Sequence, residues 1–260
     1  MSAYWAHFRT SVREDVRYFF SDSILGSLGA IGFIGLALLF YSASGQTLFF
    51  NRFTWQMMGW YLIITEMLVQ NQGNTIRKFN DEIQNGEIIS RMTKPYHYPL
   101  AMLSTYMGSV LVECTAILLL AIPFGLAVSG TSALTWYGII FGLLAIILAF
   151  LIDFAICTSI GLIAFWTEDA KPYVWIYGKI IFIFGGLLFP LEVYPPMLRA
   201  ISSYLPPAFL LYYPATLIVD FSWALLLKVL IGQIAHLILF SIIAMIMYRT
   251  SMRKVSINGG

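Results

Sequence analysis

Charged side chains are scarce in this chain of 260 residues. Asp, Glu, Lys and Arg together account for 11% of the sequence, whereas hydrophobic residues account for 59%. A soluble domain carries about 25% charged residues because its surface must be solvated. The composition therefore excludes an ordinary soluble domain, and the abundance of apolar residues excludes intrinsic disorder. The chain instead has the composition of an integral membrane protein.

Motifs for several kinds of chemistry are also missing. The only cysteines, Cys114 and Cys157, lie in apolar runs, so no disulfide framework is indicated. There is no HExxH motif, and the histidines have no metal-ligand spacing to cysteines or carboxylates. Ser159 and His236 both lie in apolar segments, but nothing marks the serine as the nucleophile of an intramembrane protease. We therefore expect no catalytic, metal or cofactor site in this chain.

Two further absences narrow the possible functions. The sequence contains no GxxxxGK motif followed by Ser or Thr, so the chain is not its own ATP-driven motor. Its formal net charge of +2 is too small to indicate nucleic acid as a partner. No internal repeat of the kind common in secondary transporters is visible.

What the sequence does contain is a series of long apolar segments. Each is long enough to span a bilayer or nearly so, since a membrane-spanning helix takes about 20 residues. We predict an all-α membrane protein with six transmembrane helices and no large extramembrane domain. The segments are 24–41, 55–71, 100–128, 136–165, 173–189 and 223–248.

Basic residues are distributed unequally over the connections between these segments. One side of the predicted membrane domain collects Arg9, Arg13, Arg17, Arg77, Lys78, Arg91, Lys94, Lys171, Arg249, Arg253 and Lys254. The other side has only Arg52 and Arg199. The side richer in Lys and Arg normally faces the cytoplasm. Both termini are therefore predicted to be cytoplasmic, in a plasma (inner) membrane.

Residues 1–22 have the pattern of an amphipathic helix. Trp5, Phe8, Val12, Val16 and Phe19 follow one another at spacings of three and four residues. Three arginines recur every four residues beside this apolar face, namely Arg9, Arg13 and Arg17. Such a helix lies in the headgroup region with its arginines on anionic lipid phosphates. The alternative is a solvated helix that packs on its own protein.

Two connections are more than simple loops. The stretch 72–99, predicted to be cytoplasmic, is the most polar part of the chain, and it reads as two short helices with a break near Gly86 and an end before Pro95. The stretch 190–220 is apolar but rich in proline, which predicts an outer re-entrant helical hairpin. The competing topology is a seventh crossing at 205–219, which would place the basic C-terminus outside.

Five ionisable residues interrupt the apolar segments. Counted at 1.5 Å per residue from the cytoplasmic helix ends, Glu66 and Lys179 lie about 8 to 9 Å deep. Glu113, Asp153 and His236 lie at roughly 18 to 20 Å. The shallow pair is predicted to gate the cytoplasmic mouth or to join two helices, unless Lys179 merely reaches the interface. At least two of the deep residues are expected to share a polar interior, as a translocation path or a helix lock.

Two stretches resemble a known family of membrane proteins. DEIQNGEIISRMTKPYHYPL at 81–100 and GGLLFPLEVYPPMLRAISSYLPPAFLLYYPA at 185–215 are similar to segments of ABC-2 type exporter permeases. The resemblance covers essentially the whole chain and includes permeases found beside daunorubicin-resistance-like ATPases. Lys94 stands where the related pattern often has Arg.

The resemblance implies a pathway formed by two permease chains, as a homodimer or a heterodimer. Each chain would dock an ABC ATPase subunit, which binds the ATP and Mg, through a short cytoplasmic coupling helix. We place this helix within 81–92, where isoleucines would enter a groove of the ATPase and charged residues would set the register. The predicted docking residues are Asp81, Glu82, Ile83, Gly86, Glu87, Ile88, Ile89 and Arg91. A solvated loop is the alternative.

The leading hypothesis is the membrane subunit of an ATP-driven exporter of an amphiphilic or hydrophobic substrate, such as a drug, a lipid, a lipid-linked glycan or a peptide. Besides the ATPase and a second permease chain, membrane lipid is the expected partner. An ion- or proton-coupled secondary transporter that uses Glu113, Asp153 and His236 is the first alternative. A membrane scaffold that transports nothing is the second.

Overall fold

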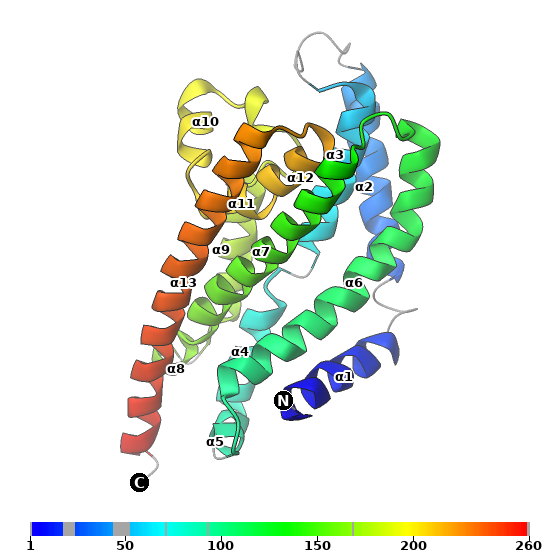
Figure 1. Cartoon of the computed structure of the whole chain (residues 1–260). Coiled ribbons are helices and arrows are strands. Elements are labelled where there is room, and N and C mark those ends of the chain that lie inside the picture. Colours follow the sequence, from blue (N-terminus) through cyan, green and yellow to red (C-terminus); the bar gives the residue numbers. More distant parts are fainter. Residues whose placement is uncertain are drawn as a thin grey trace.

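The computed structural model describes residues 2–17, 24–43, 53–70, 72–92, 94–167 and 169–258. All the regular structure in these ranges is helical (Figure 1). This confirms the all-α fold class predicted from the apolar runs.

Three helices are long and apolar enough to cross a membrane. They are α6 (Tyr98–Ser129), α7 (Trp136–Gly161), which continues into the short α8 (Ala164–Thr167), and α13 (Trp223–Asn258). The start of α7 is set by Thr135, whose side chain accepts a hydrogen bond from the N–H of Gly138 at 3.1 Å. These helices identify the chain as an integral membrane protein.

Three other predicted spans are shorter helices. They are α2 (Ile24–Ala43), α3 (Trp55–Val69) and α9 (Lys171–Phe184). With 15 residues in α3 and 14 in α9, each rises only about 21 to 22 Å, less than the roughly 30 Å of hydrocarbon in a bilayer. The six-span count therefore stays a prediction.

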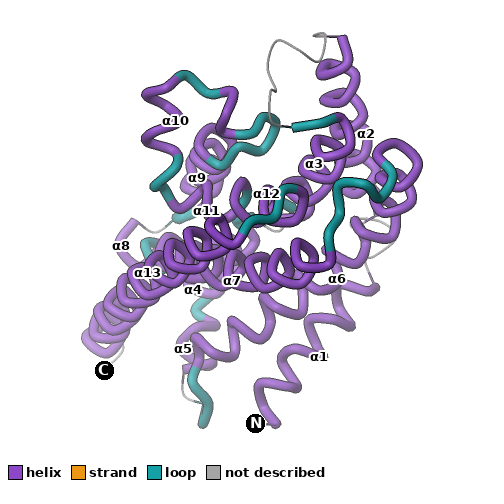
Figure 2. The backbone as a smooth tube through the Cα atoms, turned by 45° about the horizontal axis from the view of Figure 1, so that its top comes forward, coloured by secondary structure: helices purple, strands orange, loops and turns teal. Residues whose placement is uncertain are grey.

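The core lies between α3, α7 and the helices that follow α9. Tyr61, Leu62 and Ile63 of α3 are almost fully buried, and α3 packs against α2, α6 and the later helix α12. Helix α7 packs against α12 and α13 (Figure 2). Much of α13 is exposed, with Ile231, Ile238 and Ile242 among its surface residues, as expected for a lipid-facing helix.

The proline-rich stretch 190–220 forms four short helices. They are η2 (Leu191–Val193), α10 (Pro196–Ser202), α11 (Pro206–Leu210) and α12 (Tyr212–Val219). Every residue of α12 is buried, and Gly142 of α7 allows its close approach, because a Cβ there would lie 2.1 Å from Cγ1 of Ile218. From Pro206 to Val219 the chain rises about 21 Å, as little as α9, so the competing seventh crossing stays an alternative to the six-span prediction.

Helix α1 (Ser2–Arg17) packs along α6 rather than lying free of the protein. Ser11 is buried and donates a hydrogen bond to the carbonyl of Thr105 at 2.9 Å, next to Gly108. Trp5 stacks on Phe8 and is 60% exposed. The arginines predicted to face lipid, Arg9, Arg13 and Arg17, are all exposed. Packing on the protein and an exposed basic face therefore occur together, and the rest of the predicted helix, 18–22, lies outside the described residues.

The two ends of the molecule differ in what they contain. Helices α4 (Asn74–Gln84) and α5 (Glu87–Met92) lie at the same end as the start of α1 and the end of α13, whereas α10 lies at the opposite end (Figure 1). This agrees with the predicted connectivity, in which both termini and the stretch 72–99 share one side. That this side is cytoplasmic remains a prediction.

Candidate functional site

The polar connection folds into a pair of short helices, α4 and α5, here called the α4–α5 hairpin. Between them Gly86 adopts φ +71°, a left-handed conformation that favours glycine. The N–H of Asn85 bonds to the carbonyl of Asp81 at 2.9 Å and closes α4. The predicted break near Gly86 is therefore confirmed.

Helix α4 is held to the end of α7 by its apolar side. Ile76 and Phe79 are both 0% exposed. They lie against Gly161, the last residue of α7, where an added Cβ would be 2.7 Å from Cβ of Phe79. A larger residue at 161 would push the hairpin away from the membrane domain.

Polar contacts join the same helix to two further helices, α9 and α6. The N–H of Ala170, just before α9, donates to Oδ1 of Asn80 at 2.6 Å, and the first residue of α9, Lys171, pairs with Asp81 at 2.9 Å. The hydroxyl of Tyr98, the first residue of α6, donates to Oε2 of Glu82 at 2.6 Å. Helix α4 is thus fastened at one place to the ends of α6, α7 and α9.

The structure divides the predicted docking residues into an inner and an outer group. Ile88 is 1% exposed and Glu82 is 5% exposed, so both face the protein. Arg91 pairs with Glu82 at 3.1 Å and with Glu87 at 3.5 Å. The prediction that Ile88 enters a partner's groove and that Glu82 sets its register is therefore wrong.

The turn of the hairpin and the residues beside it are exposed. Asp81, Gly86 and Glu87 are exposed, together with Gln84 and Asn85. Ile83 is partly buried against the core, and the side chain of Ile89 lies outside the described residues. The exposed turn is therefore polar and carries two carboxylates, each of which also pairs within the chain, Asp81 with Lys171 and Glu87 with Arg91.

The N-terminal helix also contacts this end of the molecule. The hydroxyl of Tyr4 accepts a hydrogen bond from the N–H of His97 at 3.0 Å, and the ring of His7 meets the ring of Tyr96 edge-on. Burial, with Arg91 nearby, lowers the pKa of His7, and burial likewise lowers the pKa of Lys78 on α4.

Asp153 has the most completely bonded side chain of the deep ionisable residues. It is buried on α7, where Oδ1 accepts a hydrogen bond from Tyr177 of α9 at 2.6 Å and Oδ2 accepts one from Tyr106 of α6 at 2.9 Å. The thiol of Cys157 lies 3.7 Å from Oδ1. Asp153 therefore joins three helices inside the protein.

The other two deep residues are not part of this cluster. Oε1 of Glu113 accepts a hydrogen bond from Asn74 at 3.4 Å, near the α4–α5 hairpin. Nδ1 of His236 lies 2.7 Å from the carbonyl oxygen of Gly232, one turn earlier on α13, and its ring packs against Phe209. The prediction of a shared polar interior is wrong, since an equal depth along different helices does not make residues neighbours.

The shallow pair is also not joined. Within the described part of the chain, Glu66 forms no ion pair with Lys179. The ammonium of Lys179 lies over the ring of Trp175 at 5.5 Å and over Phe182 at 6.0 Å. The predicted charge pair is therefore wrong, whereas an ammonium held on aromatic faces is compatible with a lysine that reaches the interface.

Several residues that organise these contacts were missed by the sequence reasoning. They are Asn80, Tyr98, Tyr106, Tyr177 and Gln233, whose Nε2 donates to the carbonyls of Ala145 and Phe209 at 2.8 and 3.0 Å. Only Asn80 carried a signal, because it follows Phe79 and lies four residues after Ile76 on the apolar side of α4. Tyrosines and glutamine in apolar runs have no such pattern.

A cavity of about 440 Å³ opens beside α9, between it and the start of α4. Arg77, Lys171 and Lys179 supply positive charge to its wall, and Trp175 and Phe182 supply aromatic surface. Cations and apolar rings thus line one space.

Comparison with known protein families supplies one match. The model of a family described as "ABC-2 family transporter protein" matches residues 28–259. The match takes in every helix from α3 onward, including the α4–α5 hairpin and the helices of 190–220. No curated protein matches the chain.

Proposed function

The chain belongs to the ABC-2 transporter family, and from this premise we propose that it is the permease subunit of an ATP-driven exporter. As a transmembrane ABC permease it is a transport component rather than an enzyme, and permeases of this family generally work with ATPase partners. In this proposal ATP and Mg are bound by the ATPase subunit, and two permease chains form the pathway.

The observation that carries the proposal is the attachment of α4 to the ends of three other helices, α6, α7 and α9. Phe79 contacts the end of α7, Asn80 and Asp81 hold the start of α9, and Glu82 holds the start of α6. A force applied to the hairpin by a closing ATPase would move these helix ends together as a rigid body. A solvated loop would leave its side chains exposed, whereas Glu82, Ile76 and Ile88 are buried.

The docking surface in this proposal is the exposed turn rather than the isoleucines. Gln84, Asn85, Gly86 and Glu87 form its tip, and Asp81 lies one turn before Asn85. Acidic residues at the edge of an interface guide and register a partner that presents basic residues. Ile88 and the Glu82–Arg91 pair act from inside, because they keep the tip in one orientation.

The cavity beside α9 supports an amphiphilic substrate. Arg77, Lys171 and Lys179 suit an anionic group, and Trp175 and Phe182 suit an apolar body. Drugs, lipids, lipid-linked glycans and peptides all include molecules of this kind, moved from the cytoplasm or inner leaflet outward.

Proton-coupled transport is the weaker candidate. A proton path needs ionisable residues within reach of one another, whereas Asp153, Glu113 and His236 have separate partners on different parts of the fold. A scaffold that transports nothing does not explain why α4 is attached to three helices.

The test is the Glu87→Lys variant, with Glu14→Lys as the matched control. Both residues are exposed acids, but Glu87 lies on the hairpin and Glu14 lies on α1. Reversal of a charge in the interface should weaken ATPase binding by about tenfold or more and reduce ATP-driven transport. Co-purification of the ATPase with the tagged permease measures the effect. Equal recovery of the ATPase with both variants would refute the docking surface.

A further inference from the structure

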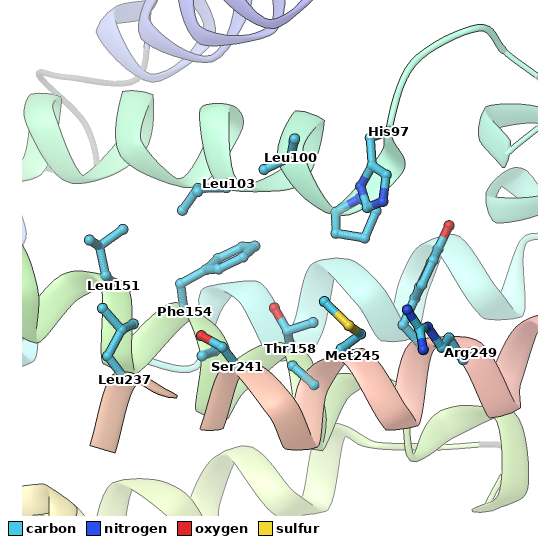
Figure 3. Close-up of a pocket in the computed structure, with 14 residues that line it drawn as sticks. His97, Leu100, Leu103, Leu151, Phe154, Thr158, Leu237, Ser241, Met245 and Arg249 are labelled. Atoms are coloured by element: carbon cyan, nitrogen blue, oxygen red, sulfur yellow. The ribbon is translucent and has the colours of Figure 1, made fainter. Parts of the chain in front are cut away.

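An apolar groove runs along the second half of α13, where this helix meets α7 and the start of α6. Its floor is α7, with Leu151 and Phe154, and its walls are the start of α6 and the second half of α13 (Figure 3). The cavity has a volume of about 350 Å³. Leu100 on one wall and Met245 on the other are about half exposed, so the groove is open along its side to whatever surrounds the protein.

The groove has the depth of one leaflet. On α13 its lining extends from Leu237 to Arg249, a rise of about 18 Å at 1.5 Å per residue. Half of the hydrocarbon thickness of a bilayer is about 15 Å. A single acyl chain that enters from the leaflet at the α4–α5 end would therefore be covered along most of its length.

The one guanidinium of this lining, that of Arg249, lies at one end of the groove. His97 and Arg249 lie together at that end, whereas Leu103, Leu151 and Leu237 lie at the other (Figure 3). Arg249 is exposed and forms no ion pair with the described residues. An unpaired guanidinium at the headgroup end of an acyl-sized groove is the arrangement that complements a lipid phosphate.

We propose that this groove binds an anionic phospholipid of the leaflet at the α4–α5 end as a resident lipid. One acyl chain lies between α6 and α13 on α7, and the phosphate lies at Arg249 with His97 beside it. The inference goes beyond the proposed function, because the lipid stays bound and requires neither the ATPase nor transport. A free phosphate would leave the apolar walls uncovered, and a peptide would leave most of its backbone groups unpaired along them.

The test uses the full chain in nanodiscs of phosphatidylglycerol mixed with phosphatidylcholine. Native mass spectrometry measures the lipids that remain after gentle release. Arg249→Gln should lower retention of phosphatidylglycerol about fivefold, as expected for one basic residue near a membrane surface. Lys228→Gln is the control, because Lys228 lies near the other end of α13, over the ring of Tyr213. Ala244→Phe fills the groove and should release both lipids.

Several results would overturn the proposal. Equal losses with Arg249→Gln and Lys228→Gln would show that no phosphate sits at Arg249. Full retention in Ala244→Phe would show that the chain lies elsewhere. Loss of a dimer peak rather than of lipid in Ala244→Phe would assign the groove to a second copy of the chain. The effect of Arg249→Gln is read in the absence of ATPase, so its outcome is separate from that of the docking test.

Discussion

Removal of one hydroxyl from the Asp153 cluster should measure how far this cluster locks α6, α7 and α9 together. The change is Tyr177→Phe, which keeps the ring and deletes the donor that lies 2.6 Å from Oδ1 of Asp153. Tyr106 still donates to Oδ2 at 2.9 Å, so the carboxyl loses one of its two hydroxyl partners. Because Asp153 is 6% exposed, water cannot easily replace the lost bond.

The magnitude follows from two opposing considerations. A buried acceptor left without its donor costs about 1 to 3 kcal/mol in soluble proteins. Interhelical hydrogen bonds in membrane proteins average about 0.6 kcal/mol and reach about 1.7, because the unfolded chain also finds partners. We expect a loss of about 1 to 2 kcal/mol, which lowers the melting temperature by roughly 2 to 8 °C.

Thermal unfolding of the detergent-solubilised protein, followed by tryptophan fluorescence, provides the measurement. Tyr204→Phe is the matched control, because Tyr204 is 78% exposed on the connection after α10. A double-mutant cycle with Tyr106→Phe should give a coupling energy, since both hydroxyls donate to the same carboxyl. A shift for Tyr177→Phe no larger than that for Tyr204→Phe would refute the lock.

A substitution in the same cluster distinguishes ATP-driven transport from proton-coupled transport. A structural lock should tolerate the near-isosteric Asp153→Asn, because the amide still offers an acceptor for one tyrosine and a donor for the other hydroxyl. ATP-driven transport should then persist in part and should not depend on a proton gradient. Complete loss of transport in this variant, together with loss in the unaltered protein when the proton gradient collapses at constant ATP, would contradict the lock and favour proton coupling.

Three further outcomes are expected. Ile88→Asp should unfold or strongly destabilise the hairpin, because it removes a buried side chain that contributes about 1.5 to 3 kcal/mol and places a carboxylate in its position. Limited proteolysis of residues 72–99 measures the loss of structure. A variant that stays stable but no longer binds the ATPase would contradict this prediction. Gly142→Ala should lower the melting temperature, because the new Cβ clashes with Ile218 at a cost of about 1 to 3 kcal/mol. Gly178→Ala is the control and should be neutral or stabilising, because no atom lies within 4 Å of its new Cβ. Gly108→Val should displace α1, because its Cβ would lie 2.9 Å from the carbonyl of Phe8; faster cleavage within α1 is the readout, and unchanged cleavage would show that α1 is not held at this contact.

The amino-acid sequence by itself determined the membrane class, the all-helical fold and the positions of the long helices. The apolar runs of α6, α7 and α13 are long enough to cross a bilayer, where a helix satisfies the hydrogen bonds of its own backbone N–H and C=O groups. Local signals also placed the break at Gly86 and the short helices of 190–220, because glycine and proline act through their own backbone geometry. The segments that resemble ABC-2 permeases led to the family that the comparison bears out.

Tertiary structure alone decided which side of each helix meets which neighbour. Ile88 in a polar stretch has the same pattern whether it enters a partner or its own protein, and only the packed fold shows that it is buried. Counting residues along α6, α7 and α13 gives a depth for Glu113, Asp153 and His236 but not the rotation of each helix about its axis. That rotation is set by contacts between distant segments, such as Gly142 with Ile218 and Tyr177 with Asp153, which no local pattern encodes.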